Sequence, residues 1–198
     1  MNYATIKKTD VANGPGIRVS LFVSGCTHCC KGCFNSEAWD FGFGQRYTQE
    51  TESEVLEALA PEYIRGLSLL GGEPMEPQNR GTVLSLVQKV RQKYPEKDIW
   101  CYTGYDYERD LLAWAAKEQE ARDGCCESGR AARPAAAEDM HGETGAGEVS
   151  QLLSLIDVLV DGEFMEEKKN LRLAFRGSEN QRLIHVKESL RQGRVVCL

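Results

Sequence analysis

The chain has 198 residues, of which 41% are hydrophobic and 27% charged, a composition that suits one globular domain with a buried core. Its net charge of -6 at pH 7 argues against general affinity for nucleic acid or anionic membranes, and no apolar run approaches the roughly 20 residues of a membrane span. Because residues 1–8 lack the apolar core of a secretory signal, we expect a cytoplasmic protein whose clustered cysteines bind metal.

The first half of the chain predicts alternating strands and helices. A glycine- and proline-rich turn at residues 13–16 leads into an apolar run, as expected for a strand buried on both faces. Strands are expected at 17–23, 64–70 and 98–104, and helices at 49–60, at 79–94 and around 111–114. This order predicts an α/β fold with a mainly parallel sheet and helices outside it.

Composition changes at residues 117–148, which are rich in Ala, Gly, Glu and Arg and nearly free of large apolar side chains. Such a segment cannot offset its ordering entropy by burial, so we expect a flexible insertion in a single domain that spans residues 1–198. Cys125 and Cys126 lie within it; incidental thiols are favoured over a redox or metal role. His141 has no context that supports a role.

A fourth strand is expected at residues 156–160, ending at Asp161 and Gly162. A polar segment at 175–181 and short apolar runs at 183–186 and 195–196 follow. Asp161 and Gly162 suit either an ordinary turn or the wall of a binding site. The same two interpretations stay open for three polar residues of the later segment, Arg176, Ser178 and Asn180. His185, among apolar residues, is predicted to be structural.

Three cysteines that could bind a metal centre directly follow the first predicted strand. Cys26, Cys30 and Cys33 have C-x3-C-x2-C spacing, and so short a loop can direct three thiolates toward one iron–sulfur cluster. Three ligands to a 4Fe–4S cube leave one iron open for a small ligand, as expected of a catalytic rather than a structural site. The carboxyl end of a parallel strand is also where ligands bind in α/β folds.

The alternative for this loop is a structural zinc site. Such a site needs four ligands, commonly from two separated pairs, whereas this chain offers one compact group. His28 and Cys29 are adjacent, but the loop is too tight for four neighbouring tetrahedral ligands. The spacing therefore favours an iron–sulfur cluster, with Cys29 as an unligated thiol.

A second motif, residues 71–74, follows the second strand. Gly71 and Gly72 would let the backbone approach a ligand closely, and Glu73 could pair with a cationic amine. The alternative is a strand-ending turn, which two glycines and Pro74 would form without a ligand. Its place one strand beyond the cysteine loop favours the binding role.

The combination of these motifs resembles the radical S-adenosylmethionine (SAM) enzymes. More narrowly, it resembles the activases that serve the anaerobic ribonucleoside-triphosphate reductase. The resemblance covers most of the chain outside the insertion and rests on the cysteine loop with Phe34 and Asn35 and on residues 13–18, 71–74, 98–104, 157–162 and 176–181. Gly32 stands where many members of the superfamily have an aromatic residue, and the insertion at 117–148 is longer than usual.

The resemblance implies a small partial (β/α) barrel that holds one 4Fe–4S cluster and SAM. The cluster ligands would be Cys26, Cys30 and Cys33. The methionine end of SAM would bind at Gly71, Gly72 and Glu73. The adenine would face the backbone of Gly32, Cys33 and Phe34.

The implied reaction is reductive cleavage of SAM with an electron from a flavodoxin or ferredoxin. The resulting 5′-deoxyadenosyl radical would take a hydrogen atom from a backbone glycine of the partner, the anaerobic ribonucleoside-triphosphate reductase. Alternatives are an activase of another glycyl-radical enzyme of the pyruvate formate-lyase type and a small-molecule enzyme such as a deazaguanine synthase. A non-catalytic, zinc-binding interaction module is the alternative from a different class.

Overall fold

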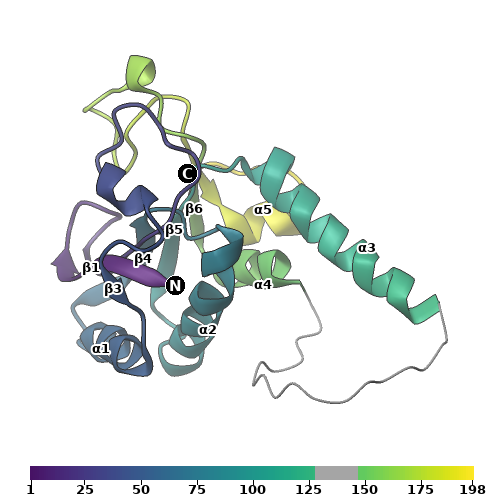
Figure 1. The fold of residues 1–198 in the computed structure, drawn as a ribbon, viewed down its shortest axis with the longest axis horizontal. Helices are drawn as coiled ribbons and strands as arrows, with labels where there is room; N and C mark the ends of the chain where they lie inside the picture. The colour runs from purple at the N-terminus through teal and green to yellow at the C-terminus, as the bar shows by residue number, and fades with distance from the viewer. Residues whose placement is uncertain (128–146) are drawn as a thin grey trace.

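The computed structural model of the chain describes residues 1–127 and 147–198, which form an α/β fold around one seven-stranded sheet (Figure 1). The strand order is β3-β1-β2-β4-β5-β6-β7. The strands are β1 (Asn2–Asp10), β2 (Ile17–Val23), β3 (Gln45–Arg46), β4 (Ile64–Gly71), β5 (Asp98–Tyr102), β6 (Val158–Asp161) and β7 (Arg182–His185). The helices are α1 (Gln49–Leu59), α2 (Pro77–Lys93), α3 (Ala113–Glu127), α4 (Glu148–Leu155) and α5 (Val186–Gln192).

The four central strands, β2, β4, β5 and β6, are parallel, and the outer strands pair antiparallel. This confirms an α/β fold with a mostly parallel sheet. The sheet is open, with β3 and β7 at its two edges. Within the described parts of the chain, no helix combines the length and apolar character that crossing a membrane requires.

The strand β1 and the short helices α4 and α5 add to the expected order of elements. β1 has no continuous apolar run because most of its side chains are at least partly exposed. An antiparallel strand can face water on one side, so its sequence lacks the signal of a buried strand. The predicted insertion at 117–148 begins within α3, and residues 128–146 lie outside the described part, as do the side chains of Cys125, Cys126 and His141.

The two faces of the sheet are covered differently. Buried side chains of α1, α2 and α4, such as Val55, Val87 and Leu152, pack with the strands into the main core. On the other face, Trp100 and Val160 belong to a smaller apolar cluster that includes the loop residue Phe175. Loops, rather than helices, cover that face near the carboxyl ends of the parallel strands, and there the fold leaves space for a site.

The buried Arg18 on β2 links this loop-covered face to neighbouring strands. Its side chain is 0% exposed; Nε donates to Ser68 Oγ at 2.7 Å and Nη1 pairs with Asp98 Oδ1 at 2.5 Å. Ser68 Oγ donates in turn to the backbone oxygen of Asn13 at 2.6 Å. The turn before β2 is therefore fixed to β4 through buried polar contacts.

We expect Asp157→Asn to lower the free energy of unfolding by about 1.5 to 3 kcal/mol at pH 7, because this carboxylate ties three elements together. It accepts from the Ile99 amide at 2.8 Å and from Lys187 Nζ at 2.6 Å, and it pairs with Arg91. Burial opposes ionisation, but these donors outweigh it and hold the pKa of Asp157 below its ordinary 3.8.

The sign of this shift means that the contribution of Asp157 is present above pH 3.8 and is lost as the pH falls through the lowered pKa. Urea unfolding should therefore show the difference between Asp157→Asn and the unmodified chain shrinking at acid pH. Glu62→Gln, on the surface, is the control and should be neutral at both pH values. A pH-independent difference would contradict the expectation.

Candidate active site

A cavity of about 550 Å³ opens at the carboxyl ends of the parallel strands, where the loops after β2, β4, β5 and β6 meet. Its volume is in the range typical of small-molecule sites. The loops after β2 and β6 project beyond the same edge of the sheet (Figure 1). The cavity is lined by all three cysteines of the predicted cluster site and by the glycine turn after β4.

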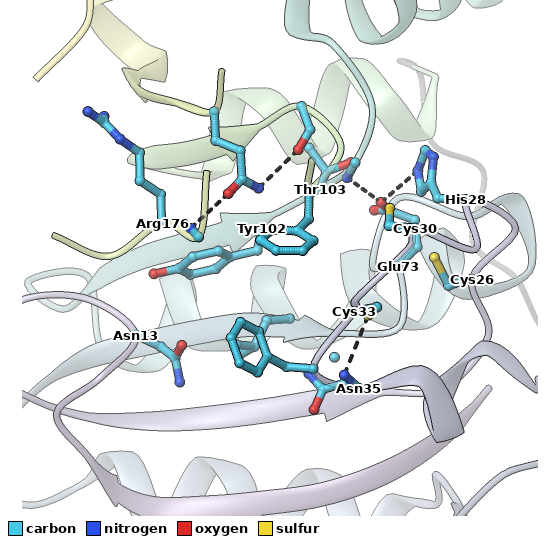
Figure 2. Close-up of a pocket in the computed structure, with 18 of the residues that line it drawn as sticks. Asn13, Cys26, His28, Cys30, Cys33, Asn35, Glu73, Tyr102, Thr103 and Arg176 are labelled. Carbon is cyan, nitrogen blue, oxygen red and sulfur yellow. Dashed lines mark hydrogen bonds and ion pairs between the residues drawn. The ribbon is translucent and has the colours of Figure 1, made fainter. Parts of the chain in front are cut away.

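The cysteine loop is held in shape by backbone hydrogen bonds. The amides of Gly25 and Cys26 donate to the carbonyls of Ala38 and Trp39, at 2.8 and 3.1 Å, and the amide of Cys33 donates to Cys30 at 3.1 Å. Cys26, Cys30 and Cys33 are half-buried free thiols, and Figure 2 shows them on one side of the cavity.

The donor set fits a cluster better than a single ion. The charge of Cys30 raises the pKa of Cys26, and the charge of Cys33 raises the pKa of Cys30, so each of these pairs lies close together. The three Sγ atoms do not all lie within 4.8 Å of one another. In a tetrahedral zinc site, the sulfur atoms of the ligands would lie about 3.8 Å apart. Three irons of a cube each take a separate thiolate, and three thiols that line one cavity can meet that requirement.

Burial opposes the ionisation of Cys26 and Cys30. It raises the pKa of Cys26 to about 12 and also raises the pKa of Cys30. Only thiolates bind metal, so cluster binding must drive the release of these protons. Cys29 has a left-handed backbone, is exposed and lies outside the cavity lining.

The glycines of the turn after β4 are needed for packing against the cysteine loop. A Cβ on Gly71 would lie 2.6 Å from Val23 O, and one on Gly72 would lie 2.6 Å from Gly25 O. The amides of Gly72 and Glu73 already donate to these same two carbonyls, at 2.7 and 2.8 Å. Close backbone approach is thus shown between two loops of the protein, and approach to SAM stays a prediction.

The Glu73 carboxylate is 1% exposed and points to protein donors. Oε1 accepts from the Met75 amide at 2.8 Å, and Oε2 accepts from the Gly104 amide at 2.7 Å and lies 3.2 Å from His28 Nε2. A carboxylate offers about four acceptor positions, and the protein takes three of them. Pairing with a ligand amine would have to use the remaining position.

His28 lies between two carboxylates. Its Nδ1 is 3.0 Å from Glu163 Oε1, while Nε2 makes the contact to Glu73. The centre of its ring lies 4.4 Å from the centre of the Tyr105 ring, in an edge-on arrangement. Burial lowers the pKa of His28, but the two glutamates outweigh burial and raise it overall. His28 therefore joins the cysteine loop to the ends of β4, β5 and β6. The sequence shows a histidine inside the cysteine motif. It does not show the role of that histidine, because the two glutamates that it contacts are far away in sequence.

Of the remaining residues predicted for cofactor binding, Phe34 lines the cavity, whereas Gly32 lies outside its lining. Gly32 has a left-handed backbone, with Glu166 packed beside it. Phe34 is 73% exposed, with Lys169 Nζ 5.0 Å from its ring centre. Both the exposure of Phe34 and its place on the cavity lining leave it available to a ligand.

The polar residues of the last third take mixed roles. Gly162 and Arg176 line the cavity, whereas Ser178 is buried and accepts from the Met165 amide at 3.2 Å. Asn180 Nδ2 donates to Glu163 O at 2.8 Å. His185 caps α5 by accepting from the Glu188 amide at 3.3 Å, which confirms its predicted structural role.

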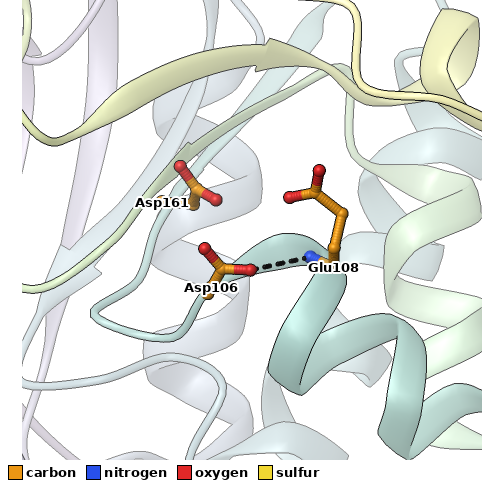
Figure 3. A group of neighbouring side chains, drawn as sticks. All are labelled: Asp106, Glu108 and Asp161. Carbon is orange, nitrogen blue, oxygen red and sulfur yellow. Dashed lines mark hydrogen bonds between the residues drawn. The ribbon is translucent and has the colours of Figure 1, made fainter.

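Asp161 belongs to an acidic group outside the cavity, with Asp106 and Glu108 (Figure 3). Arg182 Nη2 already contacts all three carboxylates, at 2.5 Å from Asp161, 2.7 Å from Glu108 and 3.3 Å from Asp106. Asp161 also accepts from the Tyr107 amide at 3.0 Å. The arrangement is an ion-pair group that joins β6 and β7 to the turn after β5.

Comparison with known proteins identifies the kind of chain that carries this site. A family model described as a 4Fe–4S single cluster domain matches residues 12–125 and 134–184. The anaerobic ribonucleoside-triphosphate reductase-activating protein of Vibrio cholerae is 43% identical over 187 residues, covering 93% of this chain and 97% of that protein. The proteins of the same name from Enterobacteria phage T4 and Escherichia coli K12 are 38% and 36% identical, covering 92% and 94% of this chain and 93% and 100% of theirs.

Single replacement of each cavity-facing cysteine should prevent assembly of a stable cluster. After anaerobic reconstitution with iron and sulfide, Cys26→Ala, Cys30→Ala and Cys33→Ala should lose most bound iron and the visible absorption of the cluster. Cys29→Ala is the matched control and should keep both. Equal damage from Cys29→Ala, or a purified protein with one zinc per chain and no uptake of iron, would contradict this assignment.

Gly104→Ala should lower the free energy of unfolding by about 1 to 3 kcal/mol and reduce cluster retention. The new Cβ would lie 2.6 Å from the ring of His28, which its two carboxylate partners hold in place. Thermal unfolding and iron content measure the two effects. Gly81→Ala, inside α2, is the control, since its Cβ would meet only the end of Glu148 at 3.2 Å. Similar results for the two variants would refute the packing argument.

Proposed function

Because the chain belongs to the family of anaerobic ribonucleoside-triphosphate reductase-activating proteins, we propose that it activates that reductase by radical SAM chemistry. The family and its 4Fe–4S domain establish an activating enzyme with an iron–sulfur cluster. The proposal adds SAM as the second cofactor, a glycine of the reductase as the site of activation, and flavodoxin or ferredoxin as the electron donor. We also propose that the open sheet is a partial barrel of the radical SAM type.

The observation that carries the proposal is the placement of three thiols beside the glycine turn in one cavity. Cys26, Cys30 and Cys33 would hold the cluster through three irons. SAM would bind in the space beside Gly71, Gly72 and Glu73, next to the cluster. When bound, the cluster supplies one electron to SAM, whose cleavage yields methionine and the 5′-deoxyadenosyl radical that takes hydrogen from the glycine.

The contribution of the chain to this reaction is position and exclusion of water. Glu73 and His28 connect the cysteine loop, the turn after β4 and the end of β5, which would fix the cluster ligands relative to the turn that binds SAM. Gly32, Cys33 and Phe34 would cover the adenine at the mouth. Because Cys26, Cys30 and Cys33 are half-buried, the surrounding chain would limit access of solvent to a bound cluster.

Electron paramagnetic resonance on a mixture of reconstituted protein, SAM, reductant and the anaerobic reductase should reveal a glycyl doublet on the reductase. The doublet should require all four components and should be absent with Cys30→Ala. Cleavage of SAM without a doublet on this reductase, but with one on an enzyme of the pyruvate formate-lyase type, would reassign the partner. Failure to cleave SAM at all would refute the radical SAM mechanism.

A further inference from the structure

The cavity has a second end, away from the cysteines. Figure 2 shows Asn13, Tyr102 and Arg176 on the side opposite Cys26. Apolar side chains, including Leu173 and Phe175, complete the lining at the loop that follows β6. Asn13, Tyr102 and Arg176 are not among the predicted cluster or SAM contacts.

The hydroxyl of Tyr102 has no partner there. Its Oη is buried from solvent and makes no hydrogen bond with the described residues. An unsatisfied buried hydroxyl costs about 1 to 3 kcal/mol, so native structures seldom leave one without a ligand or water. Burial also raises the pKa of Tyr102, so the group stays a neutral phenol that can both donate and accept.

Two further polar groups accompany this hydroxyl. Arg176 Nε is buried without a hydrogen-bond partner in the described structure. Asn13 is fixed by its neighbours: its backbone oxygen accepts from Ser68, and its Nδ2 donates to Asp10 Oδ2 at 2.5 Å. The side-chain oxygen of Asn13 is left as an acceptor on the cavity lining (Figure 2).

A phenol hydroxyl, an amide oxygen and a guanidinium N–H on apolar walls can pair with a polypeptide main chain, which presents one N–H and one C=O per residue. The mouth suits entry of a protein segment, because Phe34 and Leu171 stand on its rim at 73% and 86% exposed. Exposed apolar side chains around a cavity are typical of protein-binding surfaces.

We propose that this end of the cavity binds the main chain of the reductase segment that carries the target glycine, with a hydrogen bond to Tyr102 Oη. The inference rests on the proposed function and adds a substrate-binding site to it. Tyr102 is a binding residue for the protein substrate, separate from the residues that hold the cluster and SAM.

The test compares Tyr102→Phe with the unmodified chain as reconstituted holoenzymes and varies the concentration of intact reductase. The variant should need about 5- to 10-fold more reductase for half-maximal glycyl radical formation, the effect of one hydrogen bond. Cluster content and SAM cleavage without reductase should stay unchanged. Tyr47→Phe is the matched control, since Tyr47 Oη is also buried and unpartnered but lies outside this cavity.

Tyr102→Phe removes an unpaired group and keeps the ring, so its melting temperature should equal or exceed that of the unmodified chain. An unchanged requirement for reductase would overturn the inference. A raised requirement for SAM with an unchanged requirement for reductase would also overturn it, because the hydroxyl would then serve the cofactor. In both cases SAM cleavage by the unmodified chain would leave the proposed function standing; without that cleavage, the proposed function itself fails.

Discussion

The buried carboxylate of Glu73 is the contact on which the site depends. Removing a carboxylate from water is costly unless its oxygens are satisfied, and here two backbone amides and His28 satisfy them. Each partner comes from a different part of the chain: the turn after β4, the end of β5 and the cysteine loop. One side chain thereby sets the relative positions of the loops that surround the cavity.

Small residues make this convergence possible. Gly72 and Gly104 each stand where a Cβ would collide with the cysteine loop, at a backbone oxygen in the first case and at the ring of His28 in the second. The two glycines therefore allow loops to close on one another as well as on a ligand. A glycine motif beside a binding site can serve both purposes, and here the packing role is visible in the protein contacts.

The parallel core and the thiol arrangement were predictable because their signals are local. The apolar runs that form β2 and β4 and the spacing of Cys26, Cys30 and Cys33 can be identified within short windows. The strand β1 has too many exposed polar residues to show such a run. The roles of His28 and Tyr102 depend on neighbours that only the folded chain brings together. His28, for example, contacts Glu163, which is 135 residues away in the sequence.

The helices α3 and α4 are fixed to one another as well as to the core. Glu118 Oε2 accepts from the Val149 amide at 3.1 Å, so the two helices are joined ahead of the segment that links them. The buried side chains of α4 pack into the core on the helical face, opposite the loops around the cavity. The position of α4 against the core is therefore set by its own buried side chains and by α3, independently of the loops that line the cavity.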